Sequence, residues 1–134
     1  MSLHLQARRP VMSHLIQRIE IWPVDIPITD PFVVATGARV TAQNLFMRVT
    51  LHDGTQGIGE AAPFPEVGGE DRTSCLTAAM ELAAGMVGQS AADYERLADR
   101  LNEQAPHSPA ARCGLETALL DAYCRTQGIP LWQL

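Results

Sequence analysis

Apolar and polar side chains alternate most regularly between residues 45 and 52. A large apolar residue occupies every second position there, namely Leu45, Met47, Val49 and Leu51. A period of two indicates a β-strand with one buried face. Asp53-Gly54 follows as a turn signal, which predicts that residues 56–62 return as an antiparallel partner strand. Gly57 and Gly59 in this second strand allow another backbone or side chain to come close.

An earlier strand is predicted to begin near Ile16, but its apolar side chains change parity along the chain. Ile19 and Ile21 fall on one face, whereas the apolar residues from Trp22 onward fall on the other. We therefore expect the register to switch near Trp22-Pro23, and a β-bulge there accounts for the switch. The two prolines of this segment indicate a strand at the edge of the sheet.

Two segments carry turn residues in place of a periodic pattern. Residues 29–41 contain Asp30-Pro31-Phe32 and Gly37, which predicts a loop between two strands and not a tight hairpin. Residues 62–69, Ala-Pro-Phe-Pro-Glu-Val-Gly-Gly, are too rich in proline and glycine for either regular structure. Long loops inside a compact domain are often functional.

Three helices are predicted in the second half of the chain. The first starts around Glu70-Asp71 and ends before Gly88, the second opens with a capping box at Ser90 and Asp93, and the third runs for about 18 residues from Ser108 to Gly128. Ser108 is the expected N-cap of the third helix. The predicted buried stripes are Leu76, Ala79, Met80, Ala83 and Val87 in the first helix, and Tyr94, Leu97, Ala98 and Leu101 in the second. The order of elements predicts an α+β fold, a three-stranded antiparallel meander followed by a three-helix bundle packed on one face of the sheet.

The third predicted helix carries apolar residues on more than one face. Its main stripe, which includes Leu115 and Leu119, is joined by a second flank of Leu120, Tyr123 and Cys124. Because each apolar face needs something to pack against, one partner of this helix is expected outside the chain. Asp121 and Arg125 are spaced four apart, and the spacing alone favours a solvated ion pair over a contact with that partner.

Charge and composition exclude several classes of partner. The formal net charge is −5 and the ten Lys and Arg residues are scattered, so no nucleic-acid partner is expected. No apolar run approaches the roughly 20 residues of a membrane helix, and the first 14 residues lack the apolar core of a signal peptide. The protein is therefore predicted to be cytoplasmic, without a membrane partner. Residues 1–15 are expected to form a flexible N-terminal arm, and residues 16–134 one domain.

The reactive side chains form no catalytic arrangement along the sequence. Acidic residues are densest between 60 and 71, where the dipole of a starting helix explains them better than a divalent metal does. This acidic group comprises Glu60, Glu66, Glu70 and Asp71. The four histidines lack the spacing of zinc ligands. Cys75, Cys113 and Cys124 are expected to be reduced thiols, and a buried structural role is favoured for the last two.

Two longer motifs carry a family resemblance. Residues 118–131 fit the pattern Ala-Leu-x-Asp-Ala-x-x-Arg-x-x-Gly-x-Pro-Leu, and residues 53–61 read Asp-Gly-x-x-Gly-x-Gly-Glu-Ala. Both resemble the N-terminal capping domain of the enolase superfamily, in its mandelate racemase and muconate-lactonizing branch. Pro31-Phe32 followed by Gly37, together with Ala-Pro-Phe-Pro at 62–65, is most similar to the dipeptide epimerases of that branch.

The resemblance implies a division of labour between two domains. In that family the capping domain closes over a (β/α)₈ barrel of about 250 residues. The barrel supplies lysine acid–base catalysts and the ligands of a magnesium ion, which stabilises the enediolate formed when a proton next to a carboxylate is removed. The barrel is missing from these 134 residues, so we expect no catalytic residue, metal ligand or cofactor on this chain and no activity from it alone.

The resemblance also implies where the substrate lies. By position, the specificity loops are the segment of Asp30, Pro31 and Phe32 and the segment of Ala62, Pro63, Phe64 and Pro65. They would contact a small-molecule carboxylate substrate shared with the missing barrel. Ordinary core packing is an equal alternative for Phe32 and Phe64.

Other functions remain open at the level of sequence. Within the enzyme interpretation, the alternatives to a dipeptide epimerase are muconate cycloisomerase and o-succinylbenzoate synthase, because the shared motifs concern the fold more than the substrate. A stand-alone α+β binding or dimerisation module is the alternative from another class. It predicts that Trp132 and the second flank of the last helix are buried in a homo-oligomer or partner interface.

Overall fold

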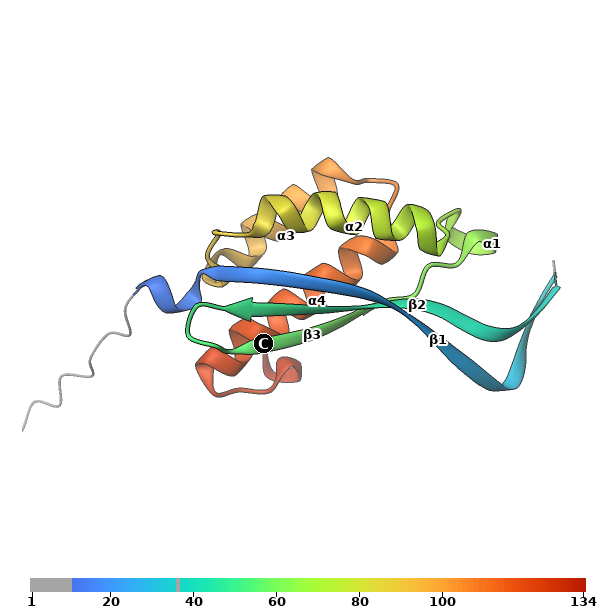
Figure 1. Cartoon of the computed structure of the whole chain (residues 1–134), viewed down its shortest axis with the longest axis horizontal. Helices are drawn as coiled ribbons and strands as arrows, with labels where there is room; N and C mark the ends of the chain where they lie inside the picture. Colours follow the sequence, from blue (N-terminus) through green and yellow to red (C-terminus); the bar gives the residue numbers. More distant parts are fainter. Residues whose placement is uncertain (1–10, 36) are drawn as a thin grey trace, which may run out of the picture.

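The computed structural model of the chain describes residues 11–35 and 37–134, which form a three-stranded antiparallel sheet followed by helices (Figure 1). The strands are β1 (Ile16–Val34), β2 (Gly37–Leu51) and β3 (Gln56–Ala61), and the α-helices are α1 (Pro65–Gly68), α2 (Arg72–Met86), α3 (Tyr94–Gln104) and α4 (Pro109–Gln127). Short 3₁₀ turns occupy Val11–His14, Ala91–Asp93 and Leu131–Gln133. The α+β class and the order of strands before helices are confirmed. The one-turn helix α1 lies in the segment expected to be irregular, and that expectation was wrong for Pro65–Gly68.

Most of the predicted N-terminal arm, residues 1–10, lies outside the described residues. The described part of the arm is tied to the domain, because the carbonyl of Leu15 accepts a hydrogen bond from the N–H of His52 at 3.0 Å. Leu15 also forms an isolated bridge with Ser90. Ordered structure therefore starts before residue 16.

The first two strands form one long hairpin. They pair from Ile16 opposite Leu51 to Val34 opposite Gly37, so the loop predicted for residues 29–41 is wrong. Asp30 and Pro31, which indicated a loop, lie in a break in the register between Pro27 and Phe32, and Gly37 lies at the end of the hairpin, where it pairs with Val34. The strand order β1-β2-β3 does place β1 at the edge of the sheet, as its prolines predicted.

The predicted bulge at Trp22-Pro23 is also wrong. Pairing runs without interruption there, and the register shifts instead after Ile16 and after Pro27. The apolar parity changes because β1 carries apolar side chains on both of its faces. Ile21 lies opposite the buried Met47 on the helix side, whereas Trp22 packs against the ring of Phe46 on the other side, with centroids 6.3 Å apart.

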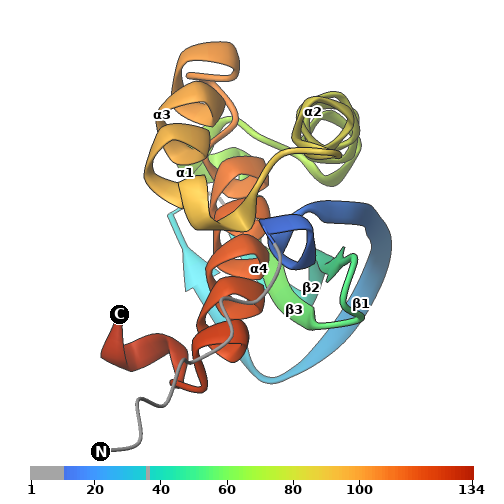
Figure 2. The same ribbon diagram turned by 90° about the vertical axis from the view of Figure 1, so that its left-hand side faces the viewer.

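Helix α4 lies against the sheet, with α3 on its other side, and α2 lies next to α4 and also contacts β1 (Figure 2). Its buried residues are Ala111, Gly114, Leu115, Ala118, Leu119, Ala122 and Cys124. The helix ends at Gly128, whose φ of 69° is the left-handed conformation that favours glycine at a helix C-terminus. The predicted bounds of this helix are thus confirmed.

The backbone of β3 lies directly on α4. A Cβ atom on Gly57 would fall 2.2 Å from the carbonyl oxygen of Ala118, and one on Gly59 would fall 2.0 Å from that of Gly114. No side chain fits in either space, so the predicted close approach at these glycines is confirmed. Asp121 reinforces the contact, since its Oδ2 accepts a hydrogen bond from the N–H of Ile58 at 2.9 Å.

Helix α2 begins with a capping box in which Asp71 accepts from the N–H of Ser74 at 2.7 Å. Its buried residues are Cys75, Ala79, Leu82, Ala83 and Met86. The predicted stripe is therefore rotated, and Met80 and Val87 are exposed. The helix is rich in small residues around its circumference, so apolar spacing did not identify one face uniquely. In α3 the prediction holds for Leu97 and Leu101, which are both buried.

The N-terminus of α4 is capped by a residue from elsewhere in the chain. Ser108 makes no side-chain capping hydrogen bond, so its predicted role is wrong. Glu70, only 4% exposed, accepts hydrogen bonds from the N–H groups of Ala110 at 2.8 Å and Ala111 at 3.3 Å. The negative charge of Glu70 was expected to interact favourably with the dipole at the N-terminus of α2. It lies instead at the N-terminus of α4.

Candidate functional site

Part of each predicted specificity loop lines one pocket beside the β1–β2 hairpin. The pocket has a volume of about 210 Å³, and its lining residues are Ile28, Phe32, Arg39, Ala42, Asn44, Ala62, Pro63 and Phe64. Phe32, Ala62, Pro63 and Phe64 are thus brought together from segments 30 residues apart in sequence. Asp30, Pro31 and Pro65 do not line it; the first two are exposed on β1, and Pro65 starts α1.

The unequal lengths of the strands create this site. Strand β3 ends at Ala61, opposite Leu45, whereas β1 and β2 continue beyond it as a two-stranded ribbon. Figure 1 shows this ribbon extending past the ends of the long helices. The segment Ala62–Phe64 follows β3 and lies against the ribbon where its third strand stops. A concave apolar surface therefore forms at the open end of the sheet.

Two aromatic rings form the outer wall of the pocket. The rings of Phe32 and Phe64 meet edge to face, with centroids 5.9 Å apart and planes at 64°. This is a favourable geometry for aromatic pairs. Phe32 is 56% exposed and neither ring belongs to the buried core. The two rings pack on each other and not in the hydrophobic core, which was the alternative expected from the sequence.

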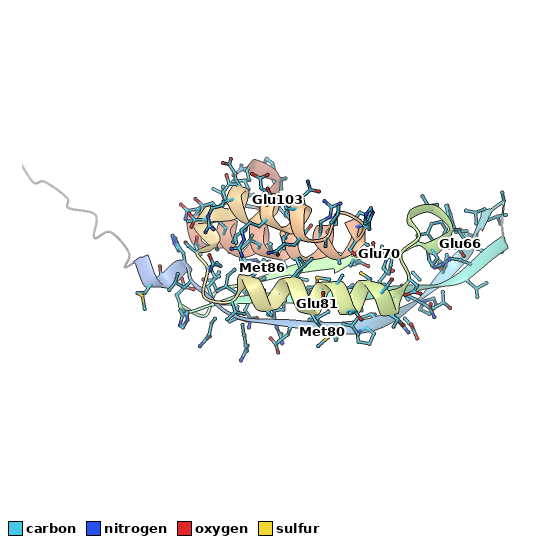
Figure 3. All side chains as sticks on the ribbon, turned by 90° about the horizontal axis from the view of Figure 1, so that it is seen from above. Glu66, Glu70, Met80, Glu81, Met86 and Glu103 are labelled. Carbon is cyan, nitrogen blue, oxygen red and sulfur yellow. The ribbon has the colours of Figure 1, made fainter. Side chains whose placement is uncertain are left out.

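Arg39 is a polar member of the site that the sequence did not indicate. Its Nη2 donates to Oε2 of Glu66 at 2.7 Å, and its guanidinium carbon lies 4.5 Å from the centroid of the Phe64 ring. Figure 3 shows Glu66 at the end of the molecule where the hairpin projects. The pair joins residues 27 apart in different elements, and no local pattern signals such a contact.

Asn44 supplies the second polar group of the pocket. It is buried, and its Nδ2 donates to Oε1 of Glu60 at 2.7 Å. The remaining lining residues other than Arg39 are apolar. The arrangement can therefore enclose an apolar group beside a few polar atoms, which is the usual composition of a small-molecule site.

The acidic residues between 60 and 71 do not converge. Glu60 binds Asn44, Glu66 binds Arg39, Glu70 caps α4, and Asp71 caps α2. The capping hydrogen bonds from Ser74 hold the pKa of Asp71 below its ordinary value. Throughout residues 11–35 and 37–134, no three His, Cys, Asp or Glu side chains are grouped so as to hold a metal ion.

The cysteines occupy two kinds of environment. Cys75 and Cys124 are buried, whereas Cys113 is exposed, so the buried role expected for Cys113 is wrong. Burial raises the pKa of the Cys75 thiol to about 12, and the negative charge of Glu70 adds to that shift. Burial also raises the pKa of Cys124. Neither buried thiol is suited to act as a nucleophile, because thiolate formation is suppressed.

Asp121 and Arg125 form the expected pair across one helical turn, at 3.1 Å. The carboxylate of Asp121 is only 18% exposed and also binds β3, so the pair is not simply a solvated one. None of the described helices combines the length and apolar character required to cross a bilayer.

Known proteins with similar sequences and structures place this chain in a family. A sequence model described as the N-terminal domain of mandelate racemase / muconate lactonizing enzyme matches residues 16–134. The aromatic dipeptide epimerase of Herpetosiphon aurantiacus is 42% identical over 120 residues, which cover 90% of this chain and 34% of the relative. The chain spans about a third of the length of such curated relatives.

Solved structures agree with the sequence comparison. A mandelate racemase/muconate lactonizing enzyme structure from Sorangium cellulosum superimposes with a TM-score of 0.81 at 43% identity, covering 90% of this chain and 34% of that one. A dipeptide epimerase from Methylococcus capsulatus, complexed with Mg and the dipeptide L-Arg-D-Lys, superimposes with a TM-score of 0.83 at 30% identity, covering 89% and 34%. The chain therefore belongs to the mandelate racemase / muconate lactonizing enzyme family, and the region it represents is the N-terminal domain of that family.

Proposed function

We propose that this chain is the substrate-capping domain of a magnesium-dependent dipeptide epimerase. In this proposal a barrel domain carries the lysines that remove and return the proton next to the substrate carboxylate, together with the ligands of the magnesium ion. The contribution of this chain, in the same proposal, is to bind the substrate side chain and exclude water. The family match and relatives such as the Herpetosiphon epimerase support the reaction class.

The observation that carries the proposal is the pocket shared by the hairpin and the Ala62–Phe64 segment. Two segments that are separate in sequence present an aromatic pair, the exposed Phe32 and the half-buried Phe64, at one open end of the domain. An apolar surface with a few polar atoms excludes water from a bound side chain and strengthens the polar interactions next to it. We infer that this surface faces the reacting part of the substrate.

Hydrogen exchange at the dipeptide α-carbon next to the carboxylate tests whether the barrel domain, and not this chain, carries out the proton transfer. The purified 134-residue chain and a longer protein with the barrel domain are each incubated with L-Ala-L-Phe and Mg²⁺ in D₂O, and loss of the α-proton signal is followed by NMR. We expect exchange from the longer protein alone, and its loss when Mg²⁺ is chelated. Magnesium-dependent exchange by the 134-residue chain would overturn the proposal.

The intact mass of the protein in its source cell provides a second test. A capping domain followed by a barrel of about 250 residues has a mass of about 40 kDa. A mass of 14.6 kDa, that of these residues alone, would count against the capping role and favour a binding module. A cytoplasmic location belongs to the same proposal, because Cys75, Cys113 and Cys124 are free thiols and cytosolic proteins keep thiols reduced.

A stand-alone binding or dimerisation module is the second candidate. Trp132 is 81% exposed and Leu134 is also exposed, which leaves apolar surface beside the end of α4. A self-associating module would bury this surface. Sedimentation of the chain between micromolar and millimolar concentration would reveal a dimer, and replacing Trp132 by Ser would abolish it. A monomer over the whole range would exclude this candidate.

The other reactions of the family are separated by substrate. Muconate cycloisomerase and o-succinylbenzoate synthase act on compounds without a peptide bond, so a panel of dipeptides, muconate and the succinylbenzoate precursor distinguishes them. We expect turnover of dipeptides by the longer protein and none of the other two compounds.

A further inference from the structure

The pocket beside the hairpin contains one cationic side chain, and its charge is already paired. Arg39 lies on β2, donates to Glu66 of α1 at 2.7 Å, and covers the Phe64 ring at 4.5 Å. Its side chain is 22% exposed and that of Glu66 is 33% exposed. A partly buried pair is screened less by salt than a pair on the open surface. The guanidinium is therefore held in place from two directions.

This arrangement links the two segments that form the pocket. The ring of Phe64 contacts both the guanidinium of Arg39 and the ring of Phe32. Glu66, two residues after Phe64, anchors the guanidinium to the segment that carries Phe64. Arginine is suited to this position because its planar group can stack on a ring and bind a carboxylate at the same time.

The pairing also determines the charge that a ligand would meet. An unpaired guanidinium at this position would attract a substrate carboxylate. With Glu66 bound to it, the pair is neutral, and the other lining residues carry no charge; the carboxylate of Glu60 is bound to one of them, Asn44, and would favour an anionic ligand no more than the neutral pair does. Asp30, an acidic residue of the hairpin segment, is exposed and does not line the pocket.

We propose that Arg39 is a positioning residue that, with Glu66, holds Phe64 against Phe32 and makes the pocket select an uncharged apolar or aromatic side chain of a dipeptide. This inference rests on the proposed function, because it identifies the substrate class for the same pocket. Arg39 does not touch the reacting atoms. It acts through the position of Phe64 and through the neutrality of the ion pair.

The test uses the longer protein, in which this domain is joined to its barrel. Steady-state kinetics are measured with L-Ala-L-Phe and L-Ala-L-Glu for the unchanged protein and for Arg39→Ala, Arg39→Lys and Glu66→Gln. The matched control is Arg96→Ala, which removes an exposed arginine that pairs with Asp93 on a distant helix. Circular dichroism melting of every variant establishes that it is folded.

Each variant has a different expected result. Arg39→Ala leaves Phe64 unsupported, so KM for L-Ala-L-Phe rises about tenfold while kcat changes less than about twofold, as expected for lost binding contacts. Arg39→Lys keeps the charge but not the stacking plane and recovers part of the loss. Glu66→Gln leaves the Arg39 charge uncompensated, so kcat/KM for L-Ala-L-Glu rises about tenfold relative to L-Ala-L-Phe. Arg96→Ala changes neither the KM for L-Ala-L-Phe nor the ratio of kcat/KM between the two dipeptides.

The outcomes separate this inference from the proposed function. If the unchanged protein epimerises no dipeptide, the proposed function fails and the inference fails with it. If it prefers L-Ala-L-Glu, or if Glu66→Gln leaves the ratio between the substrates unchanged, the inference fails while the proposed function stands. A fall in kcat with constant KM in Arg39→Ala would likewise overturn the positioning role.

Discussion

Replacing Gly59 by alanine tests the contact on which the domain is built. The added Cβ would lie 2.0 Å from the carbonyl oxygen of Gly114 and 2.7 Å from the amide nitrogen of Ala118. Carbon atoms do not approach oxygen or nitrogen so closely without a bond, so α4 would have to move away from β3 by about 1 Å or more. The obstructing atoms belong to a helix backbone and have no alternative rotamer to adopt.

The cost follows from how tightly this interface is packed. Side chains on both sides of it, among them Ala61, Leu115 and Ala118, are completely buried. Overpacking a core costs about 1–3 kcal/mol when side chains can adjust. We expect a value near the top of that range, about 3 kcal/mol, because the clash is with backbone. A domain of this size has a total stability of about 5–15 kcal/mol, so the melting temperature should fall by about 12 °C at about 4 °C per kcal/mol.

A matched glycine-to-alanine substitution elsewhere in the chain is expected to raise the free energy of unfolding instead of lowering it. Gly85 lies within α2, is exposed, and has nothing within 4 Å of its missing Cβ. Gly85→Ala should therefore stabilise the domain by about 0.5–1 kcal/mol through helix propensity. Urea unfolding followed by circular dichroism at 222 nm measures both variants. A free energy of unfolding for Gly59→Ala within about 0.5 kcal/mol of the unchanged chain would refute the close contact, since distant surface changes have effects of that size.

Three further measurements address other parts of the domain. Glu70→Leu removes the acceptor of the Ala110 and Ala111 N–H groups, so urea unfolding should show a loss of about 2 kcal/mol; an unchanged value would mean that another group caps α4. The hydrogen bond from Arg48 lowers the pKa of Glu20, so this pair stabilises the fold at neutral pH and the stabilisation disappears as the pH falls through the lowered pKa. NMR titration of Arg48→Gln should show the Glu20 pKa moving back toward its ordinary value, and an unmoved value would contradict the assignment. Native protein should react with Ellman's reagent at the exposed Cys113 only, and unfolded protein at Cys75 and Cys124 as well; rapid reaction of all three thiols in the native state would contradict their burial.

Local sequence patterns predicted most of the framework. The alternation at Leu45 to Leu51 and the turn at Asp53-Gly54 correctly indicated two paired strands, because a one-faced strand has an unambiguous period. The last helix was found with its bounds because Pro109 and Gly128 mark its ends. Gly57 and Gly59 correctly signalled a close neighbour, but not that the neighbour would be α4.

The wrong predictions share a cause. Each concerned a segment whose structure depends on the elements that pack against it in the folded domain. The bulge at Trp22-Pro23 was predicted on the assumption that β1 has apolar contacts on one face, whereas Ile21 lies opposite Met47 on one face and Trp22 contacts Phe46 on the other. The buried stripe of α2 was misplaced because small residues permit several faces. The loop at 29–41 proved to be paired strand because its partner, β2, continues to the end of the hairpin.

In the candidate site, too, the sequence indicated some of the residues but not the contacts between them. Phe32 and Phe64 were selected from a resemblance and lie in one pocket, but their residues alone contained no sign that their rings meet. Arg39 was overlooked because its partner Glu66 lies 27 residues away in another element.

Secondary structure, the α+β class and the family are encoded in short-range patterns, because backbone preference and side-chain periodicity act over a few residues. The contacts that complete the domain join residues much farther apart, 40 for the Glu70 cap on α4 and 63 for the bond between Ile58 and Asp121. Such contacts arise when whole elements pack, since burying their shared apolar surface brings polar groups together whatever their separation along the chain. The neutral, aromatic-walled pocket is a product of that packing.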